Sequence, residues 1–481
     1  MIVEKTSFIV AGAGFGDEGK GSVVDFLVRS NESREVVRYN GGPQAAHHVL
    51  IREGKWHCFS QVGSGSFVPG TRTYLSEYML TNPATLQDEL NVLKRKGMPD
   101  ASERISIHPD CIVVTPLHQL LNQMRESVRG ENRHGSVGMG VGEAVRDSRL
   151  FASQMLRMGD LTSDVVSRKI RFLWSLKIDQ AEQLAAENRH EGAMTALEKF
   201  LRDMDQNRLI DGYRALGETF RENIVSRGPD FRNGVVFEGA QGVLLDHKGG
   251  FFPHVTKTDS TMSNADRLIS EAEHDKATVR KLNVVRAYAH RHGAGPFVTE
   301  EPGLSRHLKE TFNGHNPWQG AFRVGWFDTL ATRYALSLNH RQGMLAVTNL
   351  DRLSGFPVIR VCVSYTLEVD CREGDYHAVE LDRYFEWHRK RDGTIRITDL
   401  ICDPERNEDE RSRFTELLFR CRPLEFREFP GWNTDISLAR FPWSLHSNAR
   451  RYLGFIGSGK GAGMPIGLVS VGPFGDQKFF L

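Results

Sequence analysis

The sequence lacks several features that would point to a particular class of protein. It has no run of eighteen apolar residues, so no segment predicts a helix that spans a membrane. Lys and Arg total 62 against 61 Asp and Glu, and the net charge of +1 gives no bulk reason to expect nucleic acid or a membrane surface as a partner. The N-terminal stretch has no cleavage-like targeting pattern. We therefore expect a cytoplasmic protein that binds neither nucleic acid nor membrane.

Cysteine is scarce and dispersed. None of the six cysteines forms a CxxC pair, the spacing of many metal and redox centres. They are Cys58, Cys111, Cys362, Cys371, Cys402 and Cys421. We expect reduced, structural thiols of a cytosolic protein. The 481 residues, 40% of them hydrophobic, can bury a sizeable core, and length alone leaves one large domain or two ordinary ones open.

The β-rich and helical stretches alternate along the chain. Residues 6–11 are β-rich, 12–21 form a glycine-rich turn and 22–29 are amphipathic, an order that predicts strand, turn and helix. Helical stretches separate several further β-rich runs, which favours a mostly parallel sheet with helices on both faces. These runs are 35–39, 72–75, 112–115, 234–237, 282–287, 343–348, 358–365 and 466–471.

Two segments differ from this alternation. Residues 163–227 are charged, poor in glycine and helically periodic, which predicts a helical excursion from the sheet. Residues 371–429 are strongly polar and include the charged run 404–413, so we expect a surface insertion with a mobile centre.

The glycine-rich turn has the composition of a phosphate-binding loop. Residues 14–21 read GFGDEGKG, so backbone N–H groups and the helix N-terminus can surround a polyphosphate that Lys20 neutralises. An ordinary P-loop places a Ser or Thr where this chain has Gly21, so Mg²⁺ needs another oxygen ligand, for which Asp17 is the candidate. A glycine turn with two solvated acids is the alternative.

Three polar motifs follow predicted strands and therefore reach the edge of the sheet where α/β proteins bind ligands. His47, in RYNGGPQAAHH, can donate to an oxygen that develops charge, although an isolated histidine is more often structural. Gln241, in FEGAQG, is a weak signal by itself. Asp351, in VTNLDR, can accept two N–H groups of guanine and exclude adenine, or it is simply a turn residue.

The ordered set of motifs resembles the adenylosuccinate synthetase family. The matches are GDEGKG, RYNGG, VVFEGAQG with LLD, AYAHRHGAGPFVTE, GW-D at 325–328, TNLD, FPGWNTD and SVGP, which together run from residue 12 to residue 473. The resemblance implies a single P-loop-related α/β domain over 1–481 that carries both excursions, and a homodimer with active sites near the interface.

The resemblance also implies an activity and a set of site residues. In this family GTP phosphorylates the 6-oxygen of IMP, and the amino group of L-aspartate then displaces the phosphate, in a step of purine biosynthesis that uses Mg²⁺. The implied catalytic residues are Asp17, Lys20, His47 and Gln241, with Asp17 and the Ala46 carbonyl on the metal. The implied GTP site comprises Gly16, Glu18, Gly19, Lys20, Gly21, Asp351, Ser470 and Gly472. The implied substrate contacts are Gln44, Ser136, Gln241, Thr256 and Arg323.

Several family positions are altered in the substrate pockets. The family segment GGHNAGHT reads GGPQAAHH, its Thr-Thr pair reads Ser136-Val137, and the arginine supplied by the partner subunit has no clear equivalent. The arginine-rich loop that binds aspartate reads PWQGAFR at 317–323, where only Arg323 remains. A ligase with another acceptor or a neutral amino-acid donor, a GTP-binding regulator without turnover, and ordinary adenylosuccinate synthesis with charge supplied by Arg291 all stay open.

Overall fold

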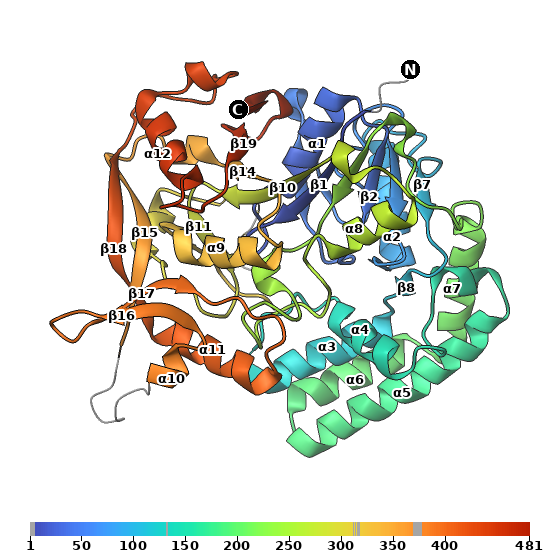
Figure 1. The fold of residues 1–481 in the computed structure, drawn as a ribbon. Helices are drawn as coiled ribbons and strands as arrows, with labels where there is room; N and C mark the ends of the chain where they lie inside the picture. The colour runs from blue at the N-terminus through green and yellow to red at the C-terminus, as the bar shows by residue number, and fades with distance from the viewer. Residues whose placement is uncertain (1–4, 131–132, 311, 313, 315–317, 369–377) are drawn as a thin grey trace.

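A large, mostly parallel sheet forms the centre of the computed structural model, which describes residues 5–481 apart from 131–132, 311, 313, 315–317 and 369–377 (Figure 1). All neighbouring strands of this nine-stranded sheet pair in parallel, except for the antiparallel pair at one edge. In spatial order they are β20 (Lys478–Phe480), β19 (Ile466–Ser470), β14 (Met344–Thr348), β10 (Val279–Arg286), β1 (Ser7–Gly12), β9 (Val235–Glu238), β2 (Glu35–Arg38), β5 (Arg72–Leu75) and β7 (Ile105–Ile107).

Helices cover both faces of this sheet because successive residues of a strand point to opposite sides. On one face Phe8 and Val10 of β1 pack against α1 (Lys20–Asn31), which buries Val24 and Leu27. On the other face Ile9 of β1 packs in a cluster with side chains of α8 (Ser263–Glu271). A strand buried on both faces reads as a continuous apolar run, and β1 is fully buried. The predicted fold class is therefore confirmed.

Two predicted strands lie outside the central sheet. The run 112–115 contributes only the short β8 (Ile112–Val113), which pairs with β6 (Leu80–Thr81). The run 358–365 forms β15 (Val358–Leu367) in a second sheet. The other members of that sheet are β13 (Phe327–Asp328), β16 (Phe385–Arg389), β17 (Ile395–Leu400) and β18 (Cys421–Pro430). A β-rich run alone does not say which sheet the strand joins.

The polar segment 371–429 folds back onto the body of the protein instead of projecting as a loop with a mobile centre. It supplies α10 (Ala378–Leu381), three strands of the second sheet and α11 (Glu408–Arg420), while 371–377 lie outside the described residues. The Asn407 side chain caps the Glu410 N–H, and the Glu410 carboxylate caps the Asn407 N–H. Three acids in the first turn suit the helix dipole, and Phe414 is buried, so the charged run begins a packed helix.

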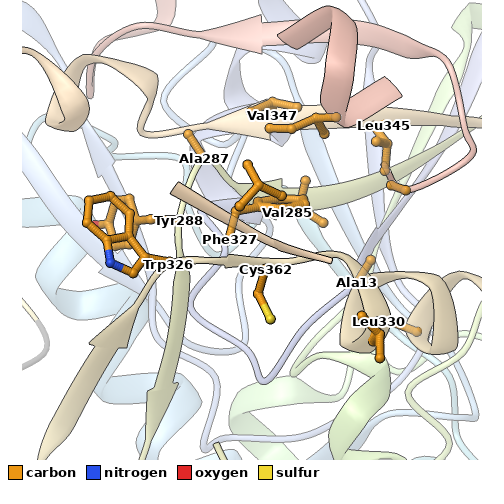
Figure 2. Packing of buried hydrophobic residues seen from close by; sticks show 14 of the residues in the cluster. Ala13, Val285, Ala287, Tyr288, Trp326, Phe327, Leu330, Leu345, Val347 and Cys362 are labelled. Carbon is orange, nitrogen blue, oxygen red and sulfur yellow. The ribbon is translucent and has the colours of Figure 1, made fainter. Parts of the chain in front are cut away.

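A continuous apolar core joins the two sheets beneath the glycine-rich turn. Figure 2 shows Ala13 of the turn with Val285 of β10, Val347 of β14, Phe327 of β13 and Cys362 of β15. The same cluster includes Leu330 of α9 (Thr329–Leu338) and side chains of α12 (Ser447–Gly457). The turn is therefore supported from below by a rigid, close-packed layer.

The segment 163–227 is helical, as its periodicity predicts. It contains α5 (Val165–Asn188), α6 (Glu191–Asp203) and α7 (Gln206–Phe220), which pack with α3 (Pro116–Arg129) in a core of their own at the lower right of Figure 1. The remaining helices are α2 (Pro83–Arg95) and α4 (Val141–Leu150). Two antiparallel strand pairs complete the frame of the site. One is the hairpin of β3 (His47–Leu50) with β4 (Trp56–Phe59), and the other is β11 (Ala289–His292) with β12 (Phe322–Gly325), which the segment 293–321 separates in the sequence.

Two expectations drawn from absences meet limited findings. In the part of the chain that the structure describes, no helix is long and apolar enough to cross a membrane. The five cysteines within the described residues all have free thiols, whereas Cys371 lies outside them.

Candidate active site

The glycine-rich turn between β1 and α1 has a tightly fixed backbone. Gly16 and Gly19 adopt left-handed φ values of 85° and 94°, which glycine tolerates without a steric cost. Glu18 is fully buried, accepts from the Gly16 N–H at 2.8 Å and pairs with Lys20, whose Nζ lies 2.5 Å from Glu18 Oε2. A turn with two solvated acids is thereby excluded. In this structure Lys20 is neutralised by its own loop.

The ends of three strands hold consecutive carbonyl groups of this loop. The Gly16 carbonyl lies 2.5 Å from Nε2 of His290, and the Asp17 carbonyl accepts from Nε of Arg286 at 2.7 Å. The Glu18 carbonyl accepts from the Thr348 hydroxyl at 2.5 Å. Arg286 and Thr348 end β10 and β14 of the central sheet, and His290 lies in β11 of the separate β11–β12 pair, so the sheet edge and this pair together fix the loop and orient the side chain of Asp17.

Asp17 is a partly exposed carboxylate in a positive environment. Its side chain is 22% exposed, and Oδ2 lies 3.4 Å from Nδ1 of His292. Burial raises the pKa of Asp17, but the hydrogen bond from His292 and the charge of Arg286 outweigh it and lower the pKa to about 2. Asp17 is therefore ionised near neutral pH, the form that ligates a divalent cation or accepts an N–H.

His47 forms a buried pair with Glu238. Glu238 is the last residue of β9. Nδ1 of His47 lies 2.6 Å from Glu238 Oε1, and the Glu238 carboxylate also accepts from the backbone N–H and the hydroxyl of Ser64. Burial lowers the pKa of His47 although Glu238 opposes the shift. Because a carboxylate only accepts, Nδ1 carries a proton and Nε2 is left for a ligand. Glu238 thus orients His47. Glu238 lies within the FEGAQG motif, from which the sequence predicted only Gln241 as a site residue.

The residue after the loop lysine must be small because His47 packs against it. A Cβ on Gly21 would lie 2.7 Å from the Cβ of His47 and 3.0 Å from the Ser64 hydroxyl. Such distances are closer than van der Waals contact allows. The histidine hairpin β3–β4 thereby occupies the space in which an ordinary P-loop carries its hydroxyl side chain.

Two glutamine side chains flank the turn that precedes the histidines. A Cβ on Gly41 would lie 3.2 Å from Oε1 of Gln241, and a Cβ on Gly42 would lie 2.9 Å from Oε1 of Gln44. Both oxygens are buried and have no hydrogen-bond partner within the described residues. Buried amide oxygens are normally paired, so these two are available to a donor on a ligand. Ala46, between this turn and His47, is exposed.

Ser136 and Thr256 lie on two segments that approach each other. The rings of His134 and His254 are 6.4 Å apart and join the loop before α4 to the segment 251–258. The Ser136 hydroxyl donates to Oδ1 of Asn122 at 2.9 Å, and the Thr256 hydroxyl lies 3.2 Å from that of Thr258. Both hydroxyl groups are thus held by neighbouring side chains.

The two strand ends proposed for guanine are neighbours in the sheet. Val347 of β14 is paired with Val469 of β19, so Asp351, which follows β14, and Ser470, the last residue of β19, lie at the ends of adjacent strands. The Ser470 hydroxyl donates to the Gly472 carbonyl at 3.0 Å. Burial raises the pKa of Asp351, while the nearby charges of Arg352 and Lys478 oppose this shift.

Arg323 and Arg291 both donate to carbonyl groups of the segment that follows β11. Arg323 donates to the carbonyls of Gly293 and Gly295 and pairs with Glu300 at 2.8 Å. Arg291 is 1% exposed, and its guanidinium stacks on Phe15 with 4.2 Å between Cζ and the ring centroid. A carboxylate that binds Arg323 therefore has to replace one of its present partners.

Several residues of the site had no sequence signal of their own. Arg286, His290 and His292 all lie in or next to the quoted AYAHRHGAGPFVTE motif. Only the structure shows that their side chains contact the glycine-rich turn. Lys478, whose Nζ donates to the Phe474 carbonyl at 3.0 Å, gave no signal in the sequence.

A glycine-rich phosphate loop, an oriented histidine and a set of unpaired acceptors at one sheet edge define a nucleotide-dependent α/β enzyme. The sequence profile described as adenylosuccinate synthetase matches residues 9–388. The adenylosuccinate synthetase of Chromohalobacter salexigens is 30% identical over 483 aligned positions, which cover 98% of this chain and 97% of that protein. The chain belongs to the adenylosuccinate synthetase family, and it is accordingly a GTP-dependent carbon–nitrogen ligase.

One solved structure gives the same fold. The fully ligated adenylosuccinate synthetase of Plasmodium falciparum aligns with a TM-score of 0.75 and 21% identity, covering 99% of this chain and 100% of that chain. The succinoaminodeoxyadenylate synthetase of cyanophage S-2L, bound to dGMP and dATP, aligns with a TM-score of only 0.48 and 17% identity over 73% of this chain and 86% of that chain. The first of these two establishes the fold, and the second is too distant to support any inference.

Proposed function

We propose that the chain joins IMP and L-aspartate at the edge of the sheet where Asp17, His47 and Gln241 lie. In the first step, a bond forms between the 6-oxygen of IMP and the γ-phosphorus of GTP, while the bond to the β–γ bridging oxygen breaks and GDP leaves. The N1 proton of the purine passes to Asp17. In the second step, the aspartate amine attacks C6, phosphate leaves with the C–O bond electrons, and the amine nitrogen loses a proton.

The observation that carries this proposal is that other groups of the protein hold both Asp17 and His47 in place. Asp17 is ionised and held by the sheet edge, whereas His47 is oriented through Nδ1 so that Nε2 can face the 6-oxygen. Deprotonating N1 pushes charge onto the 6-oxygen, and protonated His47, stabilised by the Glu238 carboxylate, donates from Nε2 to that oxygen. Neutral His47, with its proton on Nδ1, could only accept there. The unpaired Oε1 atoms of Gln241 and Gln44 suit N–H or O–H groups of the acceptor.

We assign the γ-phosphate to the loop from Gly16 to Gly21 and the guanine to Asp351, Ser470 and Gly472. Lys20 and the backbone N–H groups at the start of α1 supply positive charge for the phosphates. Asp351 can accept from guanine N1–H and N2–H₂, whereas adenine would leave it unpaired. We assign the 5′-phosphate of the acceptor to Ser136 and Thr256, and the donor carboxylate to Arg323.

The residues present fit Mg²⁺, which the family implies as a cofactor. Within the described residues, no three His, Cys, Asp or Glu side chains cluster as a closed metal cage. Mg²⁺ needs no such cage, because it often takes one carboxylate and completes its shell with water and substrate phosphates. Asp17 and the Ala46 carbonyl would hold it, and the ion would neutralise the transferring phosphoryl group.

We carry the homodimer, the cytoplasmic location and the single domain over from the family as proposals. The core beneath the loop supports the single domain, because one cluster draws buried residues from Ala13 to Phe479. A dimer mass in sedimentation would agree with the homodimer, whereas a monomer mass would contradict it. A single calorimetric unfolding transition would agree with the single domain, whereas separate transitions would contradict it.

A product assay tests the proposed function. Purified protein with GTP, Mg²⁺, IMP and L-aspartate is expected to release phosphate and form adenylosuccinate in equal amounts, detected by mass spectrometry. Parallel reactions with ATP, or without IMP, provide the controls. Phosphate release without a purine product, or no release at all, would contradict the proposal.

A further inference from the structure

His292 lies between Asp17 of the glycine-rich turn and Gly320. Its Nδ1 is 3.4 Å from Asp17 Oδ2, and its Nε2 is 3.2 Å from the Gly320 carbonyl oxygen. The side chain is 9% exposed. Two opposite edges of one ring thus contact two segments that are far apart in the sequence.

The β11–β12 strand pair, which carries His292, contacts the same two segments. On the side of the phosphate loop, His290 of β11 contacts the Gly16 carbonyl. On the other side, the Gly293 N–H donates to the Ala321 carbonyl at 3.0 Å, and Phe322 of β12 lies opposite His292 in the strand pair. The Phe322 ring centroid is 5.6 Å from that of His290 and 5.8 Å from that of His292. The β11–β12 pair therefore connects the two segments through backbone pairing and ring contacts.

We propose that His292 is a positioning residue that fixes the carboxylate of Asp17 relative to the segment 318–322, which we take as the wall of the amine-donor pocket. The inference rests on the proposed function, because the two loops serve its two successive steps. Holding Oδ2 of Asp17 leaves Oδ1 for the acceptor or the metal. Holding the Gly320 carbonyl sets the distance from that acceptor to the incoming amine.

The two contacts can be removed one at a time because Asn and Gln imitate different edges of the imidazole ring. The amide nitrogen of Asn takes the place of Nδ1, so His292→Asn keeps the contact with Asp17 and loses that with Gly320. The amide nitrogen of Gln takes the place of Nε2, so His292→Gln does the opposite. Both variants remove the ring, so a merely structural role would affect them alike. His307→Gln, at an exposed histidine that directly follows η7 (Pro302–Arg306), is the matched control.

Two kinetic readouts separate the steps. Scrambling of heavy oxygen between the bridging and non-bridging β-phosphate positions of GTP, with IMP but without aspartate, reports reversible phosphoryl transfer alone. The KM for L-aspartate reports the donor pocket. We expect His292→Gln to slow scrambling by about 10-fold or more with a nearly unchanged KM. We expect His292→Asn to raise the KM by a similar factor with scrambling close to wild type.

Hydrogen exchange gives a readout that does not depend on turnover. Peptides covering 318–325 are expected to exchange faster in His292→Asn than in His292→Gln, which should resemble wild type and His307→Gln. Equal effects of both variants on every readout, or the reverse assignment of effects, would overturn the proposal. A wild-type protein that neither scrambles GTP with IMP nor forms adenylosuccinate would instead refute the proposed function, while the exchange comparison would still test His292.

Discussion

Gly21 is the position at which the structure makes its sharpest prediction. Most P-loops carry Ser or Thr there, so Gly21→Ser restores the common sequence and offers a hydroxyl ligand for the metal. In this chain the new Cβ would lie 2.7 Å from the Cβ of His47 and 3.0 Å from the Ser64 hydroxyl. Gly21 is helical, so backbone strain plays no part. We expect the substitution to be damaging rather than restorative.

The size of the effect follows from what has to move. Forcing a side chain into a packed site costs about 1–3 kcal/mol of unfolding free energy. The cheapest relaxation shifts hairpin β3–β4 outward and pulls His47 from Glu238, to which it is bonded at 2.6 Å. A lost acid–base group lowers turnover by on the order of 10²–10⁴. Binding of GTP should change much less, because Lys20 and the loop backbone remain.

The assay combines turnover, GTP binding and thermal unfolding for Gly21→Ala, Gly21→Ser and Gly212→Ser. Gly212 is an exposed helical glycine of α7, where a Cβ meets nothing within 4 Å, so its substitution controls for helix propensity. We expect Gly212→Ser to leave turnover unchanged and Gly21→Ser to lose more than Gly21→Ala. Turnover of Gly21→Ser within about threefold of wild type would refute the reasoning, since no acid–base group would then have been displaced.

Four further substitutions test other parts of the site. Asp17→Asn should lower turnover by on the order of 10²–10⁴ while GTP still binds, and retention of a tenth of wild-type turnover would make Asp17 only a loop residue. His47→Ala should lower kcat to a similar extent with little change in the KM for GTP. Asp351→Asn should weaken GTP and improve XTP in competition assays, since wild type should prefer GTP over ATP by roughly 10³-fold. Burial lowers the pKa of Lys478 from 10.5 to about 8, so the unfolded chain holds the extra proton and stability rises with pH across that window. Lys478→Met should abolish this rise, which is about 2 kcal/mol between about pH 8 and about pH 10 as measured by denaturant unfolding.

The central sheet could be predicted because its strands carry strong local signals. Strand β5 has the predicted bounds, and β1, β9 and β14 differ from prediction by one residue or so at their ends. The same local logic was wrong for 404–413, where a high charge density was taken as a mark of mobility. The pair Asn407 and Glu410 is a capping signature, and it identifies a helix start that charge counting obscures.

The site could be predicted only in part, because motifs identify strand ends but not their partners. The turns that carry Asp17, His47 and Gln241 identify them as candidates. Glu238 was missed because a buried acid inside a strand gives no sign of the histidine that it orients, 191 positions away. The sequence also does not predict that Arg323 donates to the Gly293 and Gly295 carbonyls, since these contacts depend on the register of β11 and β12.

The ion pair inside the glycine-rich turn sets a threshold for what this loop can bind. With Nζ of Lys20 held 2.5 Å from Glu18, an arriving anion finds no vacant cation and has to compete with a carboxylate already in place. A monovalent anion has no electrostatic advantage in that competition, whereas a polyphosphate carrying several negative charges does. Glu18 therefore acts as a built-in competitor that lowers the affinity of Lys20 for every anion and raises the selectivity for the most highly charged one.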